Sequence, residues 1–209
     1  MSTINDRACV VNGVAVDKVF SDGKQVYSRN MLIESGFESG KTPSGIVWGT
    51  GDGNIKSYGV VSATPTFPTP FGNYMLQIAN QNGQSNSDQY IFIPIAKPVT
   101  IKAGETWTYS YYYASGGTAT GQASDYLLAS DDIIWDLSMG HDPRETSGGQ
   151  TSWHRFVKTW TANEDATVTT FRFGFVKTLS SDGWICIDNI KLEQDSIASP
   201  WSLAPEDVM

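Results

Sequence analysis

Short runs of alternating apolar and polar residues, separated by turn clusters, dominate the chain from Asn30 onward. Alternation with a period of two is typical of a strand that buries one face. The best examples are YMLQIA at 74–79, QYIFIPI at 89–95, TWTYSYYYA at 106–114, WHRFVKTWTA at 153–162, TFRFGFV at 170–176 and WICIDNIKLE at 184–193. This pattern predicts roughly eight to ten strands and no convincing helix. Strands spaced in this way, without helical crossovers, indicate an antiparallel β-sandwich.

In the aromatic run at 106–114, alternation divides the side chains between the two faces of one strand. One set is expected in the core: Trp107, Tyr109, Tyr111 and Tyr113. The other set is expected on an exposed sheet face that carries one ring: Thr108, Ser110 and Tyr112.

The first 30 residues contain two hairpin signals, ACVVNGVAV and VFSDGKQVY. The dipeptides Asn12-Gly13 and Asp22-Gly23 both accept the positive φ angles of tight hairpin turns. Residues 8–28 are therefore predicted to form a three-stranded meander, which needs a surface to pack on because such small sheets are marginal alone.

The segment at 125–145, DYLLASDDIIWDLSMGHDPRE, fits either one helix or two short strands. Ile133, Ile134 and Trp135 stand beside Asp-rich breaks, and this arrangement favours two strands.

Charge and composition exclude several classes of protein. The formal net charge is -8 and no basic cluster is present, which argues against a nucleic-acid partner. No apolar run approaches the roughly 18 residues of a membrane span, and no signal-type N-terminus is present. We therefore expect synthesis in a cytosol and no membrane partner.

Catalytic signals are weak. His141 and His154 are the only histidines, which leaves little for a Ser-His-Asp triad and excludes a multi-histidine zinc site. Asp131, Asp132 and Asp136 could contribute to a glycosidase pair, but spacing alone does not identify one, and a solvated loop is favoured. We expect a protein that is not an enzyme.

Aromatic residues are the real surplus, with 7 Trp, 9 Tyr and 9 Phe. Rings exposed on a sheet can stack on the C–H faces of sugars while polar neighbours bond the hydroxyl groups. Four segments occur in an order that resembles carbohydrate-binding modules of families 4, 9 and 22: NMLIESGFESG at 30–40 followed by Trp48, IKAGETWTYSYYYA at 101–114, SWHRFVKTWTA at 152–162 and WICIDNIKLE at 184–193. The resemblance covers residues 30–194 and implies an all-β, galactose-binding-like jelly roll.

This resemblance also implies a structural calcium ion, with Glu38 and Asp188 at the matching acidic positions. Calcium prefers several oxygen ligands and would tie the first strand to the last. The open alternative is that Glu38 is a turn residue and Asp188 a hydrogen-bonded strand end. Candidate sugar contacts, chosen from expected exposure and alternation, are Trp48, Tyr58, Tyr112, Trp135, Trp153 and Arg155.

The ends carry a second resemblance. IKLEQDSIASPWSLAPED at 190–207 is similar to the closing segment of phage tail and baseplate proteins, and the hairpins at 1–29 resemble small β elements of tail-associated proteins. Residues 195–209 are then an extended tail in which Trp201 packs back onto the sandwich, and residues 1–29 attach the protein to the virion.

Together the two resemblances imply a non-catalytic virion protein of a phage tail, baseplate or neck that binds host cell-wall polysaccharide during adsorption. Its other expected partners are tail or neck proteins, and virion symmetry favours a homo-oligomer. Two alternatives remain open: a connector protein without sugar binding, and a cell-wall polysaccharide depolymerase.

Overall fold

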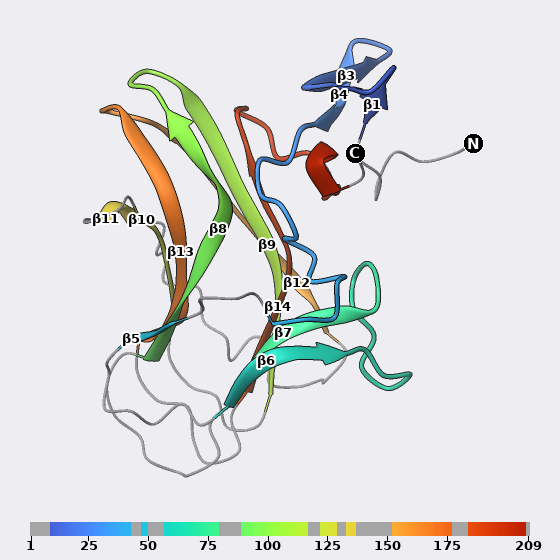
Figure 1. Cartoon of the computed structure of the whole chain (residues 1–209), viewed down its shortest axis with the longest axis vertical. Helices are drawn as coiled ribbons and strands as arrows, with labels where there is room; N and C mark the ends of the chain where they lie inside the picture. Colours follow the sequence, from blue (N-terminus) through green and yellow to red (C-terminus); the bar gives the residue numbers. More distant parts are fainter. Residues whose placement is uncertain are drawn as a thin grey trace.

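Two facing five-stranded sheets form the body of the protein (Figure 1). The computed structural model describes residues 9–42, 47–49, 57–79, 89–116, 122–128, 133–136, 152–176 and 184–207. The first sheet has the order β11 (Ile133–Asp136), β10 (Gln122–Leu128), β13 (Ala166–Val176), β8 (Gln89–Ile101) and β5 (Val47–Gly49). The second has the order β12 (His154–Thr161), β9 (Thr106–Gly116), β14 (Trp184–Glu193), β7 (Tyr74–Ala79) and β6 (Ser57–Ser62). Neighbouring strands pair antiparallel throughout both sheets.

The alternating runs predicted these strands well. Five of the six best runs lie within one strand, and the run at 153–162 extends one residue beyond each end of β12. Residues 122–136 contribute the two short strands β10 and β11 rather than a helix. The aromatic face of β9 lies between the sheets, as expected. There Tyr111 packs edge-on against Phe173 of β13, with ring centroids 5.4 Å apart. Tyr109 lies 5.2 Å from Phe171.

The N-terminal residues form two separate hairpins instead of the predicted meander. Strands β1 (Val10–Val11) and β2 (Val14–Ala15) pair only with each other, as do β3 (Lys18–Ser21) and β4 (Lys24–Ser28). The expected middle strand breaks at Asp17, a residue type depleted in strands. The Val16 amide still donates to the Cys9 carbonyl of the first hairpin at 3.0 Å, whereas the Asp17 carbonyl accepts the Arg29 amide at 2.8 Å and extends the β3–β4 ladder, so the break lies between residues 16 and 17.

The C-terminal segment (residues 194–207) contains no strand and ends in a short 3-10 helix, η2 (Pro205–Asp207). In Figure 1 it lies beside the second sheet, on the same side as the N-terminal hairpins. Among the described residues, no helix is long and apolar enough to cross a membrane.

Candidate functional site

The outer face of the second sheet is covered, which corrects the expectation that Thr108 and Ser110 are exposed. Both side chains are fully buried. The Thr108 hydroxyl donates a 2.7 Å hydrogen bond to the carbonyl of Asp195, because the C-terminal segment crosses this face. The polar side of β9 therefore binds protein backbone rather than water.

A bulge in β14 brings charged residues to the same face. Asp188 pairs with Tyr112 and Lys191 pairs with Ser110, so the register shifts between them, and Asn189 adopts a positive φ of 54°. The extra residue changes the alternation, as β-bulges do. Asp188 and Lys191 consequently both face outward.

Arg155, Lys191 and Glu193 form a buried ionic cluster beneath Ser199 and Pro200. Lys191 Nζ lies 3.5 Å from Glu193 Oε2 and donates to Ser199 Oγ at 2.7 Å and to the Pro200 carbonyl at 2.8 Å. The Glu193 carboxylate accepts the Ser199 amide at 3.0 Å and its hydroxyl at 2.7 Å. Arg155 donates to the Ser199 carbonyl and to Ser110 Oγ. Three charged side chains thus hold one dipeptide of the C-terminal segment.

Burial perturbs the titration of this cluster. It lowers the pKa of Lys191 to about 8, against the opposing attraction of Glu193. Burial likewise raises the pKa of Glu193. Both shifts follow from the cost of removing charge from water, and mutual pairing offsets part of that cost.

Trp201 is buried, as the sequence predicted. Its ring stacks on Phe71 with centroids 6.1 Å apart, and Phe71 in turn contacts Tyr112 at 5.6 Å. A Cβ at Gly36 would come within 2.7 Å of the Trp201 ring, so only glycine leaves room for the indole there. Trp201 therefore attaches the C-terminal segment to the sandwich.

The two predicted calcium ligands have structural partners. Glu38 Oε1 accepts the amides of Asn73 at 3.0 Å and Tyr74 at 3.1 Å, which fixes the start of β7. Asp188 Oδ1 accepts the Asn189 amide at 2.7 Å. Burial raises the pKa of Asp188 to about 9, and the nearby Glu38 charge adds to the shift.

The chemistry around Asp188 nevertheless suits a hard cation. Asp188 Oδ2 and Asn189 Oδ1 are buried oxygens without a hydrogen-bond partner. Calcium takes such oxygens as ligands, together with backbone carbonyls. No group of three or more His, Cys, Asp or Glu side chains suited to a metal occurs in the described ranges. Glu38 and Asp188, whose carboxyl groups lie close enough to interact electrostatically, would contribute the acidic oxygens of a calcium shell.

The predicted sugar contacts come from segments spread over both sheets. Trp48 in β5 and Trp135 in β11 belong to opposite edges of the first sheet, and Tyr58 belongs to the β6 edge of the second. The side chains of these three residues lie outside the described set. Tyr112 and Arg155 do come together, with the guanidinium 5.8 Å from the ring centroid, but Phe71 and Ser199 occupy much of their surface.

Trp153 belongs to an aromatic cluster with Phe67 and Trp184. Phe67 stacks on Trp153 with centroids 5.5 Å apart and an interplanar angle of 9°, and it meets Trp184 edge-on at 5.2 Å. Trp153 Nε1 donates to the Pro68 carbonyl at 2.7 Å, which fixes the indole. All three rings are half-buried. The sequence analysis missed Phe67 and Phe71, although two aromatics in the proline-rich loop TPTFPTPFG were a usable signal.

Comparison with known proteins identifies the type of fold. No family model matches the chain. No curated protein matches it either. Among solved structures, TmCBM61 in complex with beta-1,4-galactotriose has a TM-score of 0.55 at 17% identity, covering 80% of this chain and 100% of that one. The fold is a jelly-roll β-sandwich.

Two further structures share this jelly roll. The enzymatically active domain of bacteriophage CBA120 tailspike protein 4 has a TM-score of 0.57 at 14% identity, over 79% of this chain but only 21% of the tailspike chain. A cyclase from Fischerella sp. TAU in complex with 4-(1H-Indol-3-yl)butan-2-one has a TM-score of 0.59 at 12% identity, over 83% of this chain and 100% of the cyclase. At such identities the likeness concerns the fold alone.

Proposed function

We propose that the jelly roll is a non-catalytic saccharide-binding module in a phage tail, baseplate or neck protein, and that it binds host cell-wall polysaccharide during adsorption. The aromatic cluster is the observation that carries this proposal. Half-buried rings that hold one another in place suit stacking on sugar rings, because little side-chain entropy is lost on binding.

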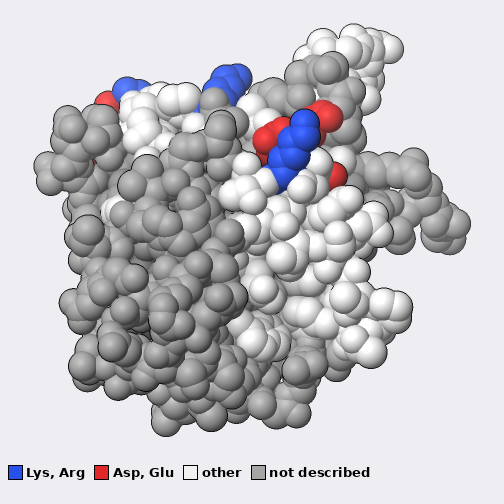
Figure 2. All heavy atoms as spheres, turned by 60° about the horizontal axis from the view of Figure 1, so that its bottom comes forward, with Lys and Arg blue, Asp and Glu red and all other residues white. Residues whose placement is uncertain are grey.

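Other features support the same proposal. The fold is shared by a carbohydrate-binding module in complex with a galactotriose and by a phage tailspike domain. Figure 2 shows a described surface that is largely uncharged, with charged side chains gathered toward its upper edge. An uncharged surface suits a neutral saccharide better than a polyanion.

The proposed lack of catalysis rests on where the acidic residues lie. Asp188 and Glu193 have the most strongly raised pKa values among the described carboxyl groups, and both are fully buried on the covered face. A glycosidase would place its pair at a substrate-accessible cleft. We also propose that calcium, held by Glu38 and Asp188, ties the loop at 34–38 to the last strand.

The test is binding by protein multimerised on beads, first to β-1,4-galactan, the linkage in the TmCBM61 complex, and then to purified bacterial cell-wall polysaccharides. Multimers are needed because avidity can raise weak affinity by about 10² to 10⁴. We expect retention without release of reducing ends. Trp153→Ala should weaken binding roughly tenfold, consistent with losing one stacked ring. The control Phe20→Ala removes an exposed ring from the N-terminal hairpins and should bind like wild type.

Failure of the multimer to bind any of these polysaccharides would favour the connector alternative, and release of reducing ends would favour the depolymerase. One observation supports the connector function. Val11, Val14 and Phe20 on the N-terminal hairpins are more than half exposed. Exposed apolar side chains on a small projecting element suit contact with another virion protein.

A further inference from the structure

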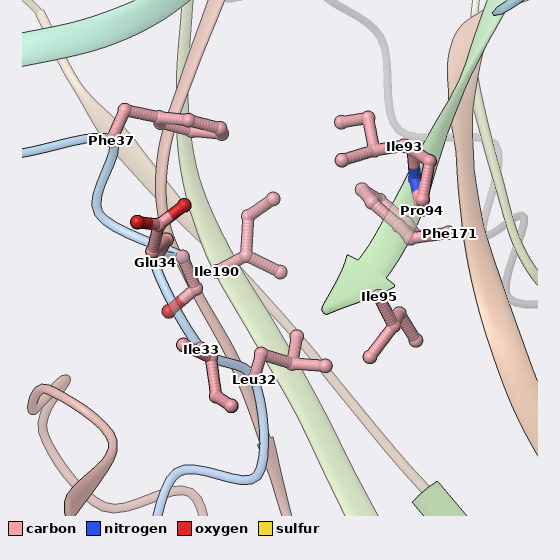
Figure 3. Close-up of a pocket in the computed structure, with 10 residues that line it drawn as sticks. Leu32, Ile33, Glu34, Phe37, Ile93, Pro94, Ile95, Phe171 and Ile190 are labelled. Carbon is pink, nitrogen blue, oxygen red and sulfur yellow. The ribbon is translucent and has the colours of Figure 1, made fainter. Parts of the chain in front are cut away.

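A mostly apolar cavity of about 320 Å³ lies between the two sheets (Figure 3), and none of its described lining residues belongs to the aromatic cluster. Residues from the loop after β4 and from β14 form one wall: Leu32, Ile33, Glu34, Ser35, Phe37 and Ile190. Residues from β8 and β13 form the other: Ile93, Pro94, Ile95 and Phe171. The volume falls within the range of small-molecule sites, which are typically lined by apolar side chains and a few polar groups.

An interruption of the sheet accompanies this cavity. Pro94 pairs with Thr170, whereas Val99 pairs with Val168, so residues 95–98 of β8 lie opposite Thr169 alone. Pro94 and Pro98 have no amide hydrogen to donate to the ladder, which explains why pairing is lost there. Bulges of this kind re-aim side chains next to functional sites. Ile95 lines the cavity at this point.

The opposite wall is a strained loop fixed from two sides. Glu34 and Phe37 adopt positive φ angles of 54° and 56°, which are costly for residues other than glycine. The Glu34 amide donates to Asp207 at 2.9 Å, and the Ile190 amide donates to the Ser35 carbonyl at 3.0 Å. The C-terminal segment and the last strand thus hold this wall in place before any ligand arrives.

Charge distinguishes the mouth of the cavity from its interior. Among the described residues that line it, Glu34 alone is charged, and it is exposed. Within the described part of the chain, its carboxylate is in no salt bridge. Phe37, Phe171 and Ile190, by contrast, are buried. A ligand that fits both parts has an apolar body and one cationic end.

We propose that this cavity binds a compact apolar amine, with its ring or branched alkyl group between Phe37 and Phe171 and its ammonium group at the Glu34 carboxylate. A saccharide does not suit the cavity, because among the described lining residues Ser35 is the only polar side chain besides Glu34, and its hydroxyl already accepts a hydrogen bond from Asn30 Nδ2 at 2.9 Å. The site is therefore separate from the proposed saccharide surface.

The test uses phenylpropylamine, phenylpropanol and phenylpropanoate, which share one ring and differ in charge, with affinities measured by isothermal titration calorimetry. The amine should bind about tenfold more tightly than the carboxylate, with the alcohol between them, as expected for one partly exposed charge pair. Glu34→Gln should make the amine bind like the alcohol. Glu164→Gln, the same change in an exposed turn, should leave the order unchanged.

Ile95→Trp fills the cavity and should abolish binding of the amine without altering retention on polysaccharide. Thermal unfolding establishes that each variant is folded, and Glu34→Gln carries the charge test even if the tryptophan variant misfolds. Equal affinities for the three compounds, no binding of the amine, or tight binding that survives a folded Ile95→Trp would overturn the proposal.

Discussion

At the two ends of the described chain, regular secondary structure and burial do not go together. The N-terminal hairpins have regular strands and tight turns, yet Phe20 is 61% exposed and Val14 is 67% exposed. The C-terminal segment has no strand, yet Trp201 is 3% exposed and Ala204 is fully buried.

The difference lies in what each segment finds on the sandwich. The C-terminal segment meets the polar face of β9 and β14, where Thr108, Lys191 and Glu193 satisfy its backbone groups. Each hairpin satisfies most of its own backbone through its ladder. The β3–β4 hairpin contacts the C-terminal segment, where Lys18 and Gln25 bind Asp195 and the Ser28 amide donates to Ser199 Oγ. Regular structure therefore does not measure how strongly a segment is integrated into a fold.

Removing one charge from the buried ionic cluster should have the largest effect. Lys191→Met leaves Glu193 buried beside fewer partners, and we expect a loss of roughly 4 kcal/mol in the free energy of unfolding. The matched change Lys24→Met, at an exposed lysine of the β3–β4 hairpin, should change stability by less than about 0.5 kcal/mol. Urea unfolding at neutral pH measures both.

Replacing Glu193 by Leu in the Lys191→Met background should recover much of the loss, since an apolar pair no longer buries a lone charge. Similar losses in the free energy of unfolding for Lys191→Met and Lys24→Met would show that the buried ionic cluster contributes no more to stability than an exposed lysine of the N-terminal hairpins.

Removing one ring from each end should give the next largest difference. Trp201→Ala loses the contact with Phe71 and leaves a cavity over Gly36, at a cost of about 3 kcal/mol. Phe20→Ala removes a mostly exposed ring and should cost less than about 0.5 kcal/mol. Urea unfolding gives the two losses.

Limited proteolysis of the same two variants, Trp201→Ala and Phe20→Ala, shows whether the C-terminal segment itself has become accessible. Trp201→Ala should release the C-terminal segment to digestion, whereas Phe20→Ala should not. An unchanged digestion pattern in Trp201→Ala would show that the indole is not what holds the segment.

The strands were predictable because alternation directly reflects burial of one face. Trp107 and Tyr111 of β9 are core residues for this reason. The turns at Asn12 and Asp22 were equally local, and both residues adopt the positive φ that such turns need.

The covered face was not predictable, because polar side chains indicate water unless a distant segment supplies partners. Nothing near Ser110 shows that Arg155 will bridge its hydroxyl to the carbonyl of Ser199. The aromatic cluster of the candidate site was not predictable for the same reason. Trp153 was chosen from its strand position, but its partners Phe67 and Trp184 come from segments far away in sequence.

The face beneath the C-terminal segment also contains Asp188, which predicts a pH-dependent effect on stability. The pKa of its carboxyl is raised by burial to about 9 in the folded chain, above the ordinary value of 3.8. Between these values the folded protein keeps a proton that the unfolded chain has lost. In EDTA, stability should therefore fall as pH rises from 5 to 8, by at most about 1.4 kcal/mol per pH unit.

Asp188→Asn is neutral at every pH and should flatten this profile, whereas Asp22→Asn in the exposed hairpin turn should keep the wild-type slope. Calcium favours the charged carboxylate, so millimolar calcium at pH 8 should raise the unfolding temperature of wild type but not of Asp188→Asn. If calcium leaves wild type unchanged while the two pH profiles still differ, Asp188 acts as a buried neutral acid. If the pH profiles of wild type and Asp188→Asn coincide, the Asp188 carboxyl is hydrated despite the covering segment. The burial that distinguishes the C-terminal end from the N-terminal hairpins then does not extend to this residue.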